Sequence, residues 1–301
     1  MSQSVALKKK IDSGDRVFYA ICYGTVFLLT LLVLYPIIFI LAASFSSPVA
    51  LSRNEVWLWP VDFSIQGYQT LLQYEAVWTG YKNTIIYVVL GTSLNVALTM
   101  LCAYVMSRKE MWGRNLVSVL FAIPLVFSGG MIPSYLVVKG LGLVDTMWAM
   151  IIPGAMSIYN MIVARTFIQS NIPGELIDAA RIDGCDDFKI FFKIVLPLSK
   201  AIISVLVLWY AVDHWNAYFS AFLYLYDSKL YPLQIILRDI LVNSTFSSDT
   251  MMDADEVANL MYLKLLLKYA LIVISTAPIL TVYPFVQKYF VKGVMVGSVK
   301  G

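Results

Sequence analysis

Long stretches without a charged side chain constrain this chain more than any other sequence feature. No Asp, Glu, Lys or Arg occurs between Arg16 and Arg53, Lys82 and Arg108, Arg114 and Lys139, Asp145 and Arg165, or Lys268 and Lys288. An ionised group is costly in hydrocarbon, and a helix needs about 20 largely apolar residues to cross a bilayer. Each of these stretches is therefore predicted to cross a membrane.

A sixth apolar stretch, residues 201–225, is interrupted only by Asp213 and His214 and is long enough to cross as well. The composition agrees, because 59% of the residues are hydrophobic and only 14% are charged. A signal peptide is the alternative for the first stretch, which follows Lys8–Lys10 and contains LAAS near residue 43. That stretch is much longer than the roughly 7–15 apolar residues of a signal peptide. We expect an uncleaved anchor and an all-α membrane protein with six transmembrane helices.

The positions of the basic residues predict how the chain is oriented. With the N-terminus inside the cell, 15 of the 22 lysine and arginine residues fall on inner segments and 7 on outer segments. Basic residues are enriched in cytoplasmic segments of membrane proteins. Both termini are therefore predicted to be cytoplasmic.

Two of the predicted outer segments are long, about 46–82 and 226–264. The first contains WLWP, an aromatic cluster typical of a membrane interface. The second contains LYPLQIILRDILV, whose apolar residues recur at helical spacing with Arg238 and Asp239 on the other side. This run is predicted to be an amphipathic helix on the outer face of the helical bundle, or equally a partly buried helix of an outer loop.

The motifs of the common enzyme classes are missing. The sequence contains neither a G-x-x-x-x-G-K phosphate loop nor G-x-G-x-x-G, G-x-S-x-G or H-E-x-x-H. The three cysteines are far apart without C-x-x-C spacing and the single histidine is His214, so neither a disulfide framework nor a metal site is expected. A net charge of +3 without a basic block does not indicate nucleic-acid binding. No catalytic residue and no bound cofactor are predicted.

The polar segment 168–200 lies between two of these apolar stretches. It is predicted to form two short helices, the second of which ends at a proline. Pro173 suits a first helical turn, and Gly184 suits a left-handed residue that ends a helix. Asp186 or Asp187 can cap the next helix, and Pro197 should end or kink it. A solvated loop is the plain alternative. Aromatic and isoleucine residues at helical spacing instead favour a helix-turn-helix with a partner surface.

The same segment carries a family resemblance. Its residues Asp178, Ala179, Ala180, Gly184, Ile194, Val195, Leu196 and Pro197 match the spacing E-A-A-x3-G-x9-I-x-L-P. This pattern resembles the "EAA" loop of permease subunits of binding-protein-dependent ABC importers, with Asp178 in place of Glu. HWNAYFSAFLYL, LYPLQIILRDIL and YFVKGVMVGSVKG resemble the carbohydrate-uptake branch, including complex-oligosaccharide permeases and the smaller maltose permease subunit.

The resemblance implies a type I ABC importer permease fold in a bacterial cytoplasmic membrane. It divides the chain into a cytoplasmic tail 1–16, a first helix and outer loop 17–79, a five-helix core 80–290 and a cytoplasmic tail 291–301. It also implies an oligosaccharide substrate and four kinds of contact: a second, different permease, two ATPase subunits that bind ATP and Mg, an external solute-binding protein and the lipid membrane.

In that family the loop couples the permease to the ATPase subunits, here through residues 171–197. The implied coupling residues are Glu175, Asp178, Ala179, Ala180, Gly184, Asp187, Phe188, Ile194, Leu196 and Pro197. Ala179, Ala180 and Gly184 would permit close approach, while Asp178 and the aromatic residues would anchor the loop.

Candidate substrate-path residues lie in the predicted spans. Asp213, Asn216 and Ser220 recur at spacings of three and four, so they are predicted to share one helical face with Trp209. Intramembrane polar groups usually face a bundle interior or a cavity. Trp215, Tyr218 and Phe219 offer flat faces for sugar rings, and Asn95 and Asn160 are further candidates from other spans. Packing between helices is the alternative for all of them.

Gly129, Gly130 and Pro133 make a straight helix improbable in the third span and predict a hinge or a kink. The main alternative for the whole chain is a secondary transporter driven by an ion gradient, which would also have intramembrane acids and broken helices. It would not require the coupling loop. An intramembrane enzyme is disfavoured by the missing catalytic residues.

Overall fold

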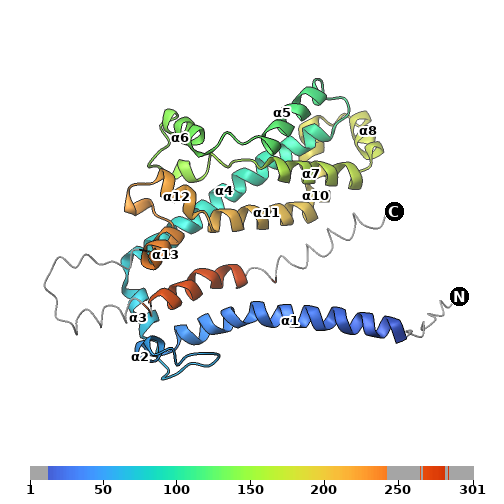
Figure 1. The fold of residues 1–301 in the computed structure, drawn as a ribbon. Helices are drawn as coiled ribbons and strands as arrows, with labels where there is room; N and C mark the ends of the chain where they lie inside the picture. Colours follow the sequence, from blue (N-terminus) through green and yellow to red (C-terminus); the bar gives the residue numbers. More distant parts are fainter. Residues whose placement is uncertain (1–12, 243–264, 266, 282–283, 285–301) are drawn as a thin grey trace. The chain divides into compact units, whose positions relative to one another are not determined.

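The computed structural model describes residues 13–242, 265, 267–281 and 284. All regular structure in these residues is helical, as the all-α prediction requires (Figure 1). The chain divides into two compact units. One contains the described residues up to Thr70 and those in 265–273, and the other contains the described residues of 71–242 and those from Ile274 onward.

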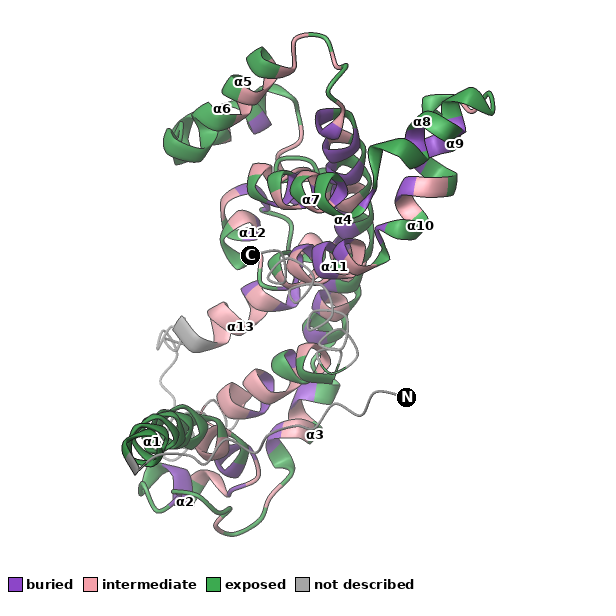
Figure 2. Cartoon of the chain, turned by 90° about the vertical axis from the view of Figure 1, so that its right-hand side faces the viewer, coloured by how far each residue is buried: buried purple, intermediate pink, exposed green. Residues whose placement is uncertain are grey.

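The first unit contains a long apolar helix, α1 (Ser13–Ser44), and the short α2 (Pro48–Ser52). Ser47 caps α2 by accepting a hydrogen bond from the backbone N–H of Ala50 at 3.2 Å. The end of α1 packs against α2 in a small core built around Ala43 and Leu51. Most of α1 is exposed in Figure 2, although its side chains are strongly apolar. Such a surface is suited to lipid rather than water.

The second unit is organised around α4 (Glu75–Ser107), a helix of 33 residues that is about 50 Å long at 1.5 Å per residue. Both α7 (Ile158–Asn171) and α11 (Lys200–Trp215) pack beside it (Figure 1). The buried stripe of α4 consists largely of small and polar residues, such as Gly91, Thr99 and Ala103. Small residues let helix backbones approach closely in membrane bundles. A side chain at Gly91 would overlap the imidazole of His214 on α11.

The remaining elements are short. They are α3 (Gln66–Gln73), α5 (Arg114–Val126), α6 (Met131–Gly140), η1 (Met147–Met150), α8 (Gly174–Ile182), α9 (Asp187–Ile190), the π-helical η2 (Phe191–Val195), α10 (Leu196–Leu198), α12 (Tyr218–Tyr224), η3 (Ser228–Leu230) and α13 (Leu233–Val242). An additional apolar helix runs from Leu267 to Thr281.

Two of the described helices, α1 and α4, are long and apolar enough to cross a membrane, and the number rises to four when each of two bent helix pairs counts as one span. The first bent pair, α5 and α6, corresponds to the predicted third span and bends by 120°. The break lies between Val126 and Met131 and includes Gly130, whose φ of +84° is a backbone conformation that favours glycine. The interruption predicted at Gly129 and Gly130 is therefore present, and Pro133 lies in the first turn of α6.

Two other predicted spans are not single helices. The apolar run between Asp145 and Arg165 forms η1, a turn containing Pro153 and Gly154, and then α7, which continues past Arg165 to Asn171. Proline and glycine interrupt the helix where hydrophobicity alone predicted continuity.

The run 201–225 breaks between α11 and α12, at Asn216 and Ala217. The prediction that Asp213, Asn216 and Ser220 share one helical face is therefore wrong. Asn216 ends α11, and its side-chain amide donates to the carbonyl of Val212 at 3.0 Å. Such local bonding by Asn competes with continuation of the helix.

The predicted outer helix is present as α13. Leu233 is fully buried and its backbone N–H donates to Thr84 Oγ1 on α4 at 2.9 Å. A side chain at Gly80 would collide with Ile236, so α13 packs closely on α4. Of the two alternatives, the partly buried helix is confirmed. The last predicted span is described only as the helix Leu267–Thr281, and its remainder lies outside the described residues, as do both predicted tails apart from residues 13–16.

Candidate functional site

The segment from α8 to α10, residues 174–198, forms the predicted helix-turn-helix at one end of α4 (Figure 1). Its turn depends on Gly184, which has a φ of +78°. The N–H of Gly184 donates to the carbonyl of Arg181 at 3.0 Å, and the N–H of Cys185 donates to that of Ala180 at 2.9 Å. This pair of bonds is a Schellman motif, in which a left-handed glycine satisfies the last carbonyls of a helix.

The second helix starts and bends where the sequence indicates. Of the two candidate caps, Asp186 is the one used, and its carboxylate accepts the N–H of Lys189 at 2.7 Å. The helix then widens into the π-helical η2 and turns by 81° into α11. Pro197 lacks an N–H and its ring clashes with the carbonyl four residues earlier, which explains the widening and the bend.

One face of the α8–α10 segment is packed into the core of the second unit. Ile177, Ile190 and Val195 are fully buried and contact residues of α4 and α7 through one continuous cluster. Ala180 is also buried there, so its small side chain serves packing within the chain. Ile194 and Leu196 are half-buried against the same cluster. The segment is thus held firmly against the bundle.

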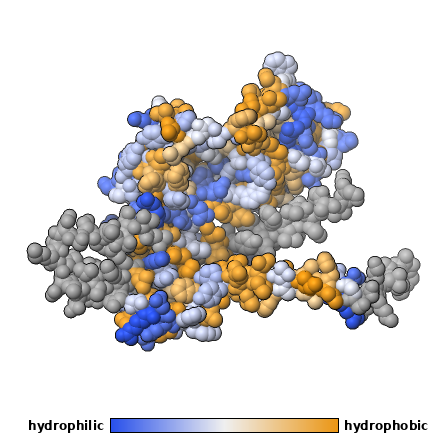
Figure 3. All heavy atoms as spheres, in the orientation of Figure 1, coloured by the Kyte–Doolittle hydropathy of each residue, from blue (hydrophilic) through white to orange (hydrophobic). Residues whose placement is uncertain are grey.

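The other face is exposed and combines charged and apolar groups. The predicted contact residues Glu175, Asp178, Ala179, Gly184, Phe188 and Pro197 lie on it. Figure 3 shows hydrophilic residues gathered over α8. Two apolar side chains also project from this face: Ile182 is 88% exposed and Phe188 is 73% exposed. Ile182 was not predicted as a contact residue. Ile182 could have been identified from its position, because it lies on the side of α8 opposite Ile177.

A hydrogen-bonded cluster ties this segment to α4. The carboxylate Oδ1 of Asp187 accepts a hydrogen bond from the Tyr104 hydroxyl at 3.2 Å and from Arg181 Nη2 at 3.3 Å. Arg181 also lies 4.0 Å from a Glu110 carboxylate oxygen. Its pKa is raised, chiefly by the hydrogen bond to Asp187. Asp187, predicted as an ATPase contact, is bonded within the chain.

The predicted substrate-path residues do not form one site. Trp215 is buried, and its indole Nε1 donates to the carbonyl of Ser275 at 3.0 Å. Asp213 is exposed near the end of α11. Tyr218 and Phe219 are exposed neighbours whose rings meet edge to face. Asn160 lies elsewhere, buried in the first turn of α7.

The additional candidate Asn95 has a packing role in the structure. Its amide Nδ2 donates to the carbonyl of Gly154 at 3.1 Å, which fixes the turn before α7 against α4. The hydroxyls of Thr99 and Tyr210 lie 2.6 Å apart, and Tyr210 also accepts the N–H of Ser157 at 3.0 Å. These bonds join α4, α11 and the turn, as expected for buried polar groups.

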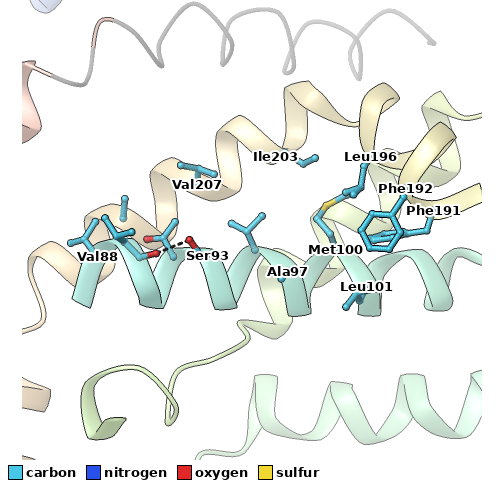
Figure 4. A pocket seen from close by; sticks show the side chains of 14 residues that line it. Val88, Ser93, Ala97, Met100, Leu101, Phe191, Phe192, Leu196, Ile203 and Val207 are labelled. Atoms are coloured by element: carbon cyan, nitrogen blue, oxygen red, sulfur yellow. Dashed lines mark hydrogen bonds between the residues drawn. The ribbon is translucent and has the colours of Figure 1, made fainter. Parts of the chain in front are cut away.

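An apolar groove of about 660 Å³ runs between α4 and α11 and ends at η2 (Figure 4). Its walls include Val88, Ala97 and Met100 from α4 and Val207 from α11, with Phe191 at its end. None of the predicted substrate-path residues lines this groove. A smaller cavity of about 320 Å³ is lined by Pro133 of the predicted hinge and by Tyr224.

Asp145 joins two loops at the opposite end of the second unit. Its carboxylate accepts the backbone N–H groups of Tyr226 and Asp227, both at 2.8 Å, and its own N–H donates to the carbonyl of Tyr224 at 2.8 Å. The bond from Asp227, followed by that from Tyr226, lowers the pKa of Asp145. Asp145 has a φ of +59°, an uncommon conformation that aspartate tolerates better than most residues.

Long apolar helices indicate a membrane protein, and α8–α10 adds a charged helix-turn-helix at one end of α4. The sequence profile of the family described as "Binding-protein-dependent transport system inner membrane component" matches residues 95–296. The chain therefore belongs to this family of ABC importer permeases.

Curated relatives match over nearly the whole chain. The "Polygalacturonan/rhamnogalacturonan transport system permease protein YtcP" of Bacillus subtilis (strain 168) is 40% identical over 287 residues, which cover 95% of this chain and 99% of that protein. The "Arabinooligosaccharides transport system permease protein AraQ" of Halalkalibacterium halodurans is 26% identical over 274 residues, covering 89% of this chain and 91% of that one.

A solved structure is similar as well. It is titled "Crystal structure of a bacterial ABC transporter involved in the import of the acidic polysaccharide alginate". The TM-score is 0.86 at 32% identity, with 94% of this chain and 100% of that chain covered. The chain thus has the fold of a permease chain from an ABC importer.

Proposed function

We propose that this chain is a transmembrane subunit of an ATP-driven importer and forms part of the translocation path for an oligosaccharide. The oligosaccharide would be delivered by an external solute-binding protein, and residues 171–197 would couple the chain to separate ATPase subunits. The observation that carries the proposal is the two-faced α8–α10 segment. Ile177 anchors one face in the core, while Ile182 and Phe188 project from the other.

The exposed side chains of Ile182 and Phe188 have the properties of interface anchors. Isolated apolar side chains are common on surfaces, but Ile182 and Phe188 are highly exposed on a segment whose inner face is rigidly packed. Apolar anchors that insert into a partner pocket dominate many interfaces. The exposed Ala179 and Gly184 leave room for a partner backbone to come close. Asp178 lies on the same exposed face and can bond a polar partner.

The geometry of α4 supports placing α8–α10 and the loop after α12 on opposite sides of a membrane. Tyr87 contacts that loop, since its hydroxyl donates to the carbonyl of Leu230. Tyr104 contacts Asp187. The two tyrosines are 104 − 87 = 17 residues apart, a rise of about 26 Å along the helix, close to the roughly 30 Å of a hydrocarbon core.

With α8–α10 in the cytoplasm, the positive-inside bias supports cytoplasmic termini, and the chain would cross a bacterial cytoplasmic membrane six times. ATP and Mg would bind to the partner ATPase subunits. The second permease would be a different, homologous chain. The break at Gly129, Gly130 and Pro133 would act as a hinge between α5 and α6.

The names of the relatives support an oligosaccharide as the substrate class. They include transport systems for polygalacturonan and rhamnogalacturonan and for arabino-oligosaccharides, and the similar solved structure belongs to an importer of alginate. The residues predicted to line the path, Asp213, Asn216, Tyr218 and Phe219, are exposed on this single chain and can face a partner or a path between subunits.

Replacing Ile182 by Ala tests the proposed ATPase contact. We expect the affinity for the ATPase subunits to fall by about 2 kcal/mol, because truncating a buried interface anchor has this effect. The measurement is co-purification and titration of the ATPase subunits with the detergent-solubilised permease pair. Leu198→Ala is the matched control, because Leu198 is also exposed but lies outside the proposed coupling residues 171–197. Equal affinity for Ile182→Ala and wild type would contradict the contact.

Uptake by the reconstituted complex separates the proposal from a transporter driven by an ion gradient. Uptake should stop when ATP is removed and should continue in the presence of an uncoupler, because the energy is expected to come from nucleotide hydrolysis. The opposite pattern would support the ion-gradient mechanism.

A further inference from the structure

Hydrogen bonds hold α4 at two points that are far apart along its axis. Near its start, Asn83 Nδ2 donates to the carbonyls of Lys229 at 2.7 Å and Tyr231 at 3.0 Å. One turn later, the hydroxyl of Tyr87 donates to the carbonyl of Leu230 at 2.8 Å. Three successive carbonyls of the loop after α12 are thus bonded to one helix. This loop leads directly into α13, which packs on the same end of α4.

Near its other end, α4 is bonded to the α8–α10 segment. The buried Tyr104 donates its hydroxyl to Asp187, and its ring packs against Phe191 with centroids 5.4 Å apart. Asp187 in turn accepts the bond from Arg181, so a single carboxylate connects α4 with both α8 and α9. Figure 1 shows α8 and α10 at this end of α4, and α12 and α13 at the other.

In α4, no residue of the kinds that commonly bend a helix is left uncovered. It contains no proline, and its two glycines are both covered, Gly80 by α13 and Gly91 by the imidazole of His214. Sharp kinks in helices occur mainly at proline, at glycine or where the hydrogen-bond ladder is interrupted. A displacement at Asp187 would therefore move α4 as a rigid body.

We propose that α4 is a strut that mechanically links the ATPase-docking segment to the outer loop 225–231, with Asp187 and Asn83 as the positioning residues at its two ends. This inference rests on the proposed function. It adds that the outer loop responds to the ATPase through α4, and that the external binding protein influences ATP hydrolysis along the same helix. Because coupling between two sites is reciprocal, both directions depend on the same bonds.

The strut is tested in the complete importer, reconstituted with its ATPase subunits and its external binding protein. The quantity measured is the factor by which the loaded binding protein stimulates ATP hydrolysis. Tyr104→Phe removes the hydroxyl that bonds Asp187, and Asn83→Ala removes the amide at the other end. Tyr104 is buried, so an effect of Tyr104→Phe on the stimulation factor does not arise from a lost contact with the ATPase.

Two control variants match these changes. Ser93→Ala lies in the middle of α4 and removes only a bond to the carbonyl of Val89 within the same helix. Ser204→Ala makes the same kind of change on α11, where it removes only a bond to the carbonyl of Lys200. We expect both controls to retain the wild-type stimulation factor.

Each strut variant should lower the stimulation factor about fivefold, the lower end of typical couplings between sites, and the yield of assembled complex should be unchanged. The double variant should be no worse than either single variant, because both changes interrupt one connection. Normal stimulation in both single variants, or losses that multiply in the double variant, would overturn the strut. A wild-type chain that does not assemble with ATPase subunits would instead overturn the proposed function, and the strut with it.

Discussion

The α8–α10 segment and the α5–α6 pair both expose apolar side chains, yet in different settings. On α8–α10, Ile182 and Phe188 stand among acidic and basic residues, and the opposite face is deeply packed. On α5–α6 no charge occurs between Arg114 and Lys139, and Val138 is the single buried residue of the two helices. The first region therefore suits water, where we propose that it meets the ATPase, and the second suits lipid or another membrane helix.

This difference shows that exposure alone does not define a docking surface. The charged residues around Ile182 and Phe188 favour a position outside the hydrocarbon, where the proposed partner would cover these two apolar side chains. An uncharged surround allows the side chains of α5 and α6 to remain in contact with lipid tails at no cost. The first substitutions below change residues of these two regions, and the last changes Trp215 on α11.

Gly184→Leu should have the largest effect and abolish uptake. A left-handed conformation costs a leucine roughly 1–2 kcal/mol, and the larger side chain would also block close approach of the ATPase. Around Gly184 this chain leaves open space, so the chain should still insert into the membrane. The measurement is uptake by the complex, with membrane insertion assayed in parallel.

Gly184→Asn separates the two causes, because asparagine tolerates the left-handed region. It should preserve the turn and still weaken ATPase docking. Gly140→Leu is the control on α6, where there is also open space but no positive φ. Normal uptake and normal ATPase assembly with Gly184→Leu would contradict the proposed docking.

Ile177→Ala should destabilise the second unit by about 2–5 kcal/mol, as is typical for a large-to-small change in a core. Ile177 is 0% exposed, whereas Ile182 on the same helix is 88% exposed. Ile182→Ala should change the stability by no more than about 0.5 kcal/mol. Thermal unfolding of the purified chain in detergent measures both. Equal destabilisation by the two variants would remove the distinction between the packed and the docking face.

Leu120→Lys should impair membrane insertion of α5, because a lysine near the centre of a span costs about 2.5–3.5 kcal/mol. Phe188→Lys makes the same kind of change on α8–α10, where the side chain is expected to face water, and should leave insertion normal. The fraction of chain resistant to alkaline extraction from membranes measures the effect. If both variants insert equally well, the assignment of α5 to the hydrocarbon is wrong.

Trp215→Phe should have the smallest effect. It removes the hydrogen bond to the carbonyl of Ser275, worth about 0.5–1.5 kcal/mol, while the ring remains buried beside Tyr81. We expect a modest loss of stability and an unchanged ranking of transported sugars. A changed ranking would show that Trp215 contacts the substrate, as the sequence alone suggested.

Local features of the α8–α10 segment could be predicted from the sequence. The left-handed Gly184, a cap at Asp186 or Asp187 and the bend at Pro197 each follow from rules that act within a few residues. The break at Gly130 follows in the same way. The partly buried state of α13 was one of two open alternatives, because periodicity identifies an apolar face but not the surface that covers it.

The contacts between distant segments could not be predicted. Tyr104 and Asp187 are 83 residues apart, and Trp215 and Ser275 are 60 residues apart. Hydrophobicity also failed at residues 145–165 and 216–217, where turns and side-chain bonds to the backbone interrupt uniformly apolar runs. Hydrophobicity does not distinguish a straight helix from an interrupted one in such runs, because lipid can contact any apolar surface.

The sequence alone indicated the helical membrane class, the family and the helix-turn-helix, since each depends on composition or on short spacing. Only the tertiary structure showed that Asp187 accepts a hydrogen bond from α4, that Ile182 is exposed and that Trp215 is buried. The physical reason is that a side chain's role depends on which groups lie within a few ångströms of it, and folding brings most of these from elsewhere in the chain.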